Sequence, residues 1–174
     1  MSYTLEKFAK ECHKFLVVDS DNEGREKVRS LLSKVLIDDT FVTENFPKSN
    51  DAARSVLYED NELGFCICSH VYKHEAMSKP HSHGPHWAIY GQVLGQTEMF
   101  DYEFVKHPKS SEESGTCRVI RSYILNPGDA HLYNVGDLHA PKRSGATKLV
   151  RIEGKNLDTI KRVYHQEEKT VAAE

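Results

Sequence analysis

The 174-residue sequence has no long hydrophobic run, and no stretch approaches the roughly 18 consecutive apolar residues of a membrane span. It also lacks an excess of positive charge, since 23 Lys and Arg stand against 26 Asp and Glu, for a formal net charge of −3. Nucleic acids and anionic membranes bind cationic surfaces, so we expect neither as a partner. The first fifteen residues carry acids and no apolar segment, which does not suit a secretory signal.

Cysteine is scarce and irregularly spaced, because Cys12, Cys66, Cys68 and Cys117 form no CxxC pair. This usage predicts reduced thiols in the core of a cytoplasmic protein rather than a disulfide framework. Cys66 and Cys68 lie two residues apart in a predicted strand and therefore on one face. Cys68 is on this ground a candidate to line a pocket and bind substrate, although two buried core thiols fit the pattern equally well.

The spacing of apolar residues differs between the first and the later part of the chain. Apolar residues first recur every three or four positions, which predicts helices over about 5–16 and 28–36 and a shorter one over 38–45. Past about Ser55 the period becomes two, and turn residues separate many short strands with no helix between them, which predicts an all-β sandwich or barrel. The predicted strands cover 65–72, 87–94, 98–104, 118–125, 131–135 and 147–153. We expect a helical cover over 1–50, a barrel over 51–165 and a polar tail over 166–174.

Ten histidines are more than chance would supply, and they are densest in Pro80-His81-Ser82-His83-Gly84-Pro85-His86. The prolines and glycine exclude a helix here, so His81 and His83 are expected on one face of a strand, where both can reach one metal ion. Two Gly-Asp-x-His segments offer a third imidazole, from His131 or His139. His70, just before this cluster, is expected at the surface, with the rim of the site as the alternative.

Together these residues resemble the two sequence motifs of the cupin superfamily, over about residues 55–155. The first is the His-x-His pair followed twelve residues later by Gly95, and the second is Pro127-Gly128-Asp129-Ala130-His131. The resemblance implies a double-stranded β-helix, the jelly-roll barrel of cupins, behind an N-terminal helical segment. The glutamate of the first motif is missing, since Trp87 and Ala88 stand in its place.

A cupin without that glutamate is similar to the cysteine dioxygenase type, in which three histidines bind iron(II). The segments Gly95–Tyr102 and Lys148–Glu153 extend the likeness and set a register in which His139 is the third ligand, with His81 and His83. His131 then lies near the barrel rim, although the generic second motif fits it. The implied cofactor is Fe(II), while Ni, Mn or Zn suit the same ligands.

The resemblance also suggests residues around the metal. Arg54 resembles the arginine that holds the substrate carboxylate in that family, with a surface charge at a helix end as the alternative. Glu153, with Arg151 two residues before it, stands where the family has the tyrosine of its catalytic relay, a departure that argues against cysteine itself as the substrate. Tyr90 and Gln92 share a strand face and could line the barrel interior, Tyr90 as a catalytic residue and Gln92 as a substrate-binding one, with core packing as the alternative.

Three functions are consistent with this pattern. The first is a non-haem iron(II) dioxygenase, similar to thiol dioxygenases, that acts on a small anionic metabolite and O2. The second keeps the metal as a Lewis acid for isomerase or lyase chemistry, and the third is a non-catalytic cupin that binds a small ligand. A cupin fold hosts all three and does not choose among them. A homodimer is a further expectation.

Overall fold

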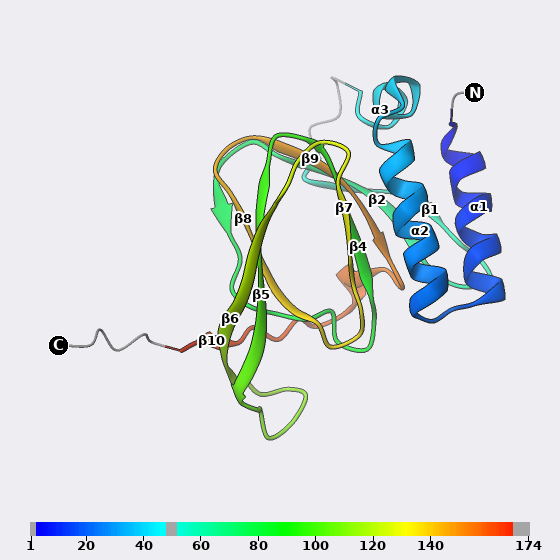
Figure 1. The fold of residues 1–174 in the computed structure, drawn as a ribbon. Coiled ribbons are helices and arrows are strands. Elements are labelled where there is room, and N and C mark those ends of the chain that lie inside the picture. The colour runs from blue at the N-terminus through cyan, green and yellow to red at the C-terminus, as the bar shows by residue number, and fades with distance from the viewer. Residues whose placement is uncertain (1–2, 48–51, 169–174) are drawn as a thin grey trace.

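The computed structural model of the protein describes residues 3–47 and 52–168, and shows a layer of helices against one side of a strand barrel (Figure 1). The helices are α1 (Leu5–Val18), α2 (Asn22–Val35) and α3 (Asp39–Asn45), which confirms the three that were predicted. The predicted boundary between residues 50 and 51 lies outside the described residues. None of the described helices has the length and apolar composition that a membrane span requires.

Local sequence explains where two of these helices start. The Thr4 hydroxyl accepts a hydrogen bond from the Lys7 amide, and the Asp38 carboxylate accepts bonds from the amides of Thr40 and Phe41. Each side chain satisfies amides that have no partner in the first turn of a helix.

The described residues form ten strands in two five-stranded sheets. From β2 to β9 the chain passes back and forth between the sheets, except at the β5–β6 hairpin, so the sheets close on one another as a double-stranded β-helix. The first sheet has the order β1-β2-β9-β4-β7 and the second β10-β6-β5-β8-β3. The strands are β1 (Arg54–Glu59), β2 (Cys66–Tyr72), β3 (Ala76–Met77), β4 (Ala88–Leu94), β5 (Thr97–Lys106), β6 (Thr116–Leu125), β7 (Ala130–Tyr133), β8 (Leu138–Arg143), β9 (Thr147–Glu153) and β10 (Gln166–Glu167).

This is the predicted cupin fold, and the six predicted strands are present. Strand β8 was not predicted from the sequence, because Pro141 interrupts it and proline is uncommon inside sheets. Strand β10 lies in the segment expected as a polar tail and pairs in parallel with β6.

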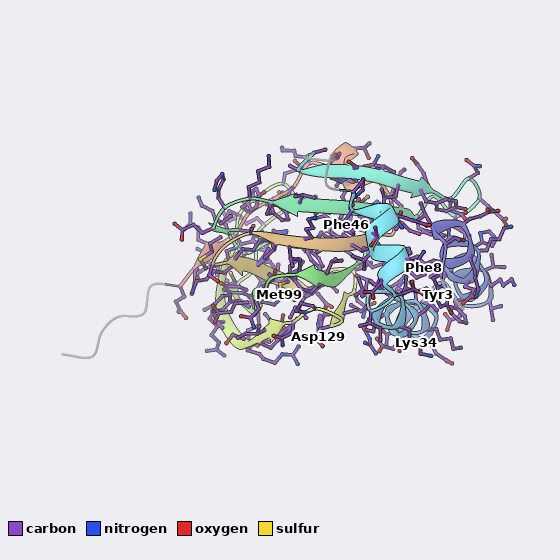
Figure 2. All side chains as sticks on the ribbon, turned by 90° about the horizontal axis from the view of Figure 1, so that it is seen from above. Tyr3, Phe8, Lys34, Phe46, Met99 and Asp129 are labelled. Atoms are coloured by element: carbon purple, nitrogen blue, oxygen red, sulfur yellow. The ribbon has the colours of Figure 1, made fainter. Side chains whose placement is uncertain are left out.

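The outer face of the first sheet packs against the helices. Ile67 on β2, Ile89 on β4 and Ile152 on β9 are fully buried in one cluster with residues of α1 and α2. Gly91 permits the close approach of α2, because a Cβ there would lie 2.7 Å from Cδ2 of Leu32. Seen from above, Phe8 and Phe46 lie on the helical side and Met99 among the strands (Figure 2).

The inner face of the same sheet carries buried polar side chains among apolar ones such as Leu149. Side chains alternate along a strand, so the neighbours of the three isoleucines point into the barrel. These neighbours are buried as well: Cys66, Cys68 and His70 on β2, Tyr90 and Gln92 on β4, and Arg151 and Glu153 on β9. The barrel interior therefore holds most of the residues in which the sequence suggested chemistry.

Candidate metal centre

Three histidines converge inside the barrel. His81 and His83 lie in the segment between β3 and β4, and His139 lies on β8. The backbone of His81 bonds to that of His139 in both directions, at 3.0 and 2.9 Å, which fixes the loop against the strand. One ring nitrogen of each histidine lies within 4.8 Å of those of the other two. Of the two candidates for the third position, the structure brings His139 to the pair.

Burial keeps these imidazoles neutral. The exposed fractions are 1% for His81, 3% for His83 and 0% for His139. Loss of solvation lowers the pKa of His81 to about 4 and that of His83 to about 2, and it places the pKa of His139 well below its ordinary value. A neutral imidazole has a free lone pair, so all three rings can act as metal ligands near pH 7.

Backbone carbonyls orient two of the rings. Nδ1 of His81 lies 2.8 Å from the Lys79 carbonyl oxygen, and Nδ1 of His139 lies 3.3 Å from that of Asp137. Such contacts fix the tautomer and leave Nε2 for a metal ion. Nε2 of His81 and Nδ1 of His83 are enclosed and have no hydrogen-bond partner. An enclosed nitrogen without a partner costs free energy, and a metal ion bound by Nε2 of His81 would remove that cost there.

The Tyr90 hydroxyl contacts two of these rings. Its oxygen lies 3.2 Å from Nε2 of His83 and 3.4 Å from Nε2 of His139. The Arg151 guanidinium lies over the Tyr90 ring at 5.6 Å, and Tyr133 stacks on His139 with ring centroids 3.8 Å apart. The predicted placement of Tyr90 in the barrel interior is therefore what the structure shows.

Glu153 joins two arginines beside this group. Its Oε1 accepts a hydrogen bond from Nε of Arg151 at 2.6 Å, and its Oε2 accepts one from Arg54 at 2.8 Å. Arg54 also pairs with Asp158 at 2.6 Å, so two carboxylates already engage the guanidinium that was suggested for substrate binding. Burial, reinforced by the charge of Glu153, raises the pKa of the Cys68 thiol to about 12, so this side chain stays protonated.

Gln92 and His131 lie farther from the three rings. The Gln92 amide donates to the Leu94 carbonyl at 2.8 Å and accepts from the Thr97 hydroxyl at 2.9 Å, so it ties β4 to β5. His131 packs between Tyr123 and Tyr133, with both ring centroids 4.8 Å away, and lines an open cavity of about 340 Å³. His131 is therefore not one of the three converging rings.

Two residues of the barrel interior were not predicted to lie there. His70 was expected at the surface, but only 3% of it is exposed, because it shares the inward face of β2 with Cys66 and Cys68. That shared parity was the available signal. Arg143 is also buried, at 6% exposure, and shares the inward face of β8 with His139. Its signal was hidden because β8 was not predicted as a strand.

All four cysteines are free and buried, as their spacing predicted. The strand order and the three-histidine group together define a cupin-type barrel with a candidate metal centre.

No protein-family model matches the sequence, and no curated protein matches it. Among solved structures, KdgF from Halomonas sp. is 16% identical with a TM-score of 0.45, over 62% of this chain and 82% of that one. A protein with a double-stranded β-helix domain from Klebsiella pneumoniae is 16% identical with a TM-score of 0.48, over 72% and 88%. The cupin domain of Cnp3 from Schizosaccharomyces pombe is 10% identical with a TM-score of 0.46, over 65% and 73%. Similarity this low carries no information about activity.

Proposed function

We propose that this protein is a metal-dependent enzyme, a non-haem iron(II) dioxygenase that acts on a small anionic substrate and O2. The observation that carries the proposal is the convergence of three buried, neutral imidazoles on one point. Neutral ligands leave the full double charge on a bound ion, which favours an anionic donor from the substrate. Three protein ligands also leave coordination positions open, unlike the closed, thiolate-rich sites of structural zinc.

A bound ferrous ion would supply the point at which O2 and substrate meet and the path by which electrons pass from substrate to O2. His81, His83 and His139 would hold it, and the backbone bonds that fix these rings would preserve their geometry. Nickel, manganese or zinc would suit the same nitrogens, and a redox-inactive ion there would support isomerase or lyase chemistry instead.

The surrounding residues would position groups and exclude water. The Tyr90 hydroxyl lies where it can donate a hydrogen bond to a substrate atom between the rings of His83 and His139. Arg151 lies over the Tyr90 ring, and Glu153 holds Arg151, so we assign these two the role of positioning residues for that hydroxyl. The Cys68 thiol, protonated and buried, would contribute a wall of the site rather than a nucleophile.

Oxygen consumption tests the proposal directly. The chain would be loaded with Fe(II) under anaerobic conditions and mixed with O2 and a panel of small thiols and diketones. We expect O2 uptake that matches substrate loss and that stops when a chelator removes the iron. Metal-dependent substrate conversion without O2 uptake would favour the redox-neutral alternative, and ligand binding without turnover would favour a binding protein.

Tyr90→Phe tests the hydroxyl. We expect kcat to fall about a hundredfold, as for loss of a proton donor, while iron content stays unchanged. Tyr58→Phe is the matched control, because that hydroxyl bonds to Asp60, away from the three rings, and its loss should leave kcat unchanged.

Arg151→Lys should shift the pH profile of kcat without a loss of iron if Arg151 positions Tyr90. An unchanged profile would leave Arg151 a purely structural residue.

A further inference from the structure

One buried cation in the barrel has no anionic partner. Arg143, at the end of β8, is 6% exposed, and its guanidinium stacks on the Tyr72 ring at 3.9 Å. Within residues 3–47 and 52–168, its side chain makes no hydrogen bond and no ion pair, and its Nε is enclosed without a partner. Arg54 and Arg151, the neighbouring arginines, instead share Glu153.

Two other enclosed polar atoms without partners lie at the same end of the barrel. They are Nε2 of His70 and the hydroxyl oxygen of Thr147. His70 pairs with Leu149 and Tyr72 with Thr147 across β2 and β9, which makes His70 and Thr147 diagonal neighbours on the inward face. Thr147 is also only four residues beyond Arg143, across the turn from β8 to β9.

These groups share the interior with the candidate metal centre. Arg143 and His139 point to the same side of β8 and are four residues apart, about 13 Å along a strand. Burial lowers the pKa of Arg143, and Tyr72, Tyr90 and Arg151 are close enough to influence it. An arginine nevertheless stays protonated in proteins, so a positive charge remains buried here. A buried positive charge that only an aromatic ring contacts is stabilised by a counter-charge.

We propose that Arg143, His70 and Thr147 form a subsite that binds the carboxylate group of a small molecule. Charge selects the ligand class, because one unpaired guanidinium balances one carboxylate, whereas a phosphate dianion would leave an excess negative charge. Donors are present for both oxygens: the guanidinium N–H groups, the Thr147 hydroxyl, and Nε2–H of His70 when its Nδ1 accepts from the Tyr72 hydroxyl at 3.2 Å. As a substrate subsite this assignment rests on the proposed function, but carboxylate binding itself does not.

Titration of the full-length, metal-free chain with sodium propionate tests the subsite, with sodium chloride at equal ionic strength as the reference. We expect calorimetric binding and a higher melting temperature in propionate. Arg143→Gln should weaken propionate binding at least tenfold, and Thr147→Val should weaken it severalfold. Arg118→Gln is the control, because Arg118 is exposed and pairs with Glu103, so propionate affinity should not change. Arg143→Gln should also melt no lower than the unaltered chain in chloride, because it removes an unpaired buried charge.

Several results would overturn the assignment. They are absence of propionate binding by the unaltered chain, equal binding by Arg143→Gln, or tighter binding of inorganic phosphate than of propionate. If Arg143→Gln fails to fold, Thr147→Val and His70→Gln decide the matter by the same titration, and undiminished affinity in both would reject it. His139→Ala should still bind propionate, so failure of the metal centre and failure of this subsite are separable.

Discussion

The two faces of the first sheet are opposites, although they belong to the same strands. Toward the helices, Ile67, Ile89 and Ile152 bury apolar surface, which is the main source of folding free energy. Toward the barrel interior, Cys68, Tyr90 and Glu153 bury polar groups that need partners and are costly without them. Neighbouring residues such as Ile152 and Glu153 therefore bury different kinds of group, an apolar side chain on the outer face and a paired carboxylate on the inner face.

Removing the charge of Glu153 should produce the largest loss of stability. Glu153→Gln leaves Arg151 and Arg54 without the carboxylate they share, and breaking a buried ion pair costs about 3–5 kcal/mol. Chemical denaturation of the metal-free protein measures this loss. A cost below about 1 kcal/mol would mean that the inner face does not depend on this pair.

Acidification should destabilise the protein through His70. Burial places the pKa of His70 well below its ordinary value, so below about pH 6.5 the unfolded chain takes up a proton that the folded chain does not. Folding stability then falls with pH by about 1.4 kcal/mol per unit for this one group. Denaturation curves at pH 7, 6 and 5 should show a shallower decline for His70→Gln. Parallel declines in the two proteins would contradict a buried, neutral His70.

The outer face should respond to volume alone. Ile152→Val removes one methylene from the packed cluster, and such changes cost about 1 kcal/mol. Metal content should be unchanged, because Ile152 points away from the histidines. A change in metal affinity at constant fold would show that the two faces are coupled.

Breaking a solvent-exposed ion pair should cause the smallest loss of folding stability. Glu103 and Arg118 pair at 2.7 Å with exposed side chains, and Glu103→Gln should cost less than about 0.5 kcal/mol. A loss as large as that from Ile152→Val would mean that an exposed ion pair contributes as much to stability as a packed methylene of the outer face.

The spacing of apolar residues in the sequence predicted most of the helices and strands. The helices and the strands that pack against them bury one regular apolar face each, so their spacing is visible in the sequence, and the histidine pair could be placed on one face by parity. Strand β8 lacked such a signal because Pro141 interrupts it, and proline is uncommon inside sheets.

The partners inside the barrel could not be predicted in the same way. Whether Arg54 is paired or Arg143 is unpaired depends on contacts between strands far apart in the chain, such as Arg54 with Glu153. Sequence parity places a side chain on a face but does not identify its neighbour across the barrel. The choice of His139 over His131 came from family resemblance, since both follow the same Gly-Asp-x-His pattern.

Metal stoichiometry tests the central claim most directly. The metal-free chain would be titrated with Fe(II) without oxygen, freed of unbound ions and analysed by mass spectrometry, beside His139→Ala and the matched His131→Ala. We predict about one ion for each unaltered chain, nearly the same for His131→Ala, and almost none for His139→Ala. Retention of iron by His139→Ala, or its absence from the unaltered chain, would contradict the account.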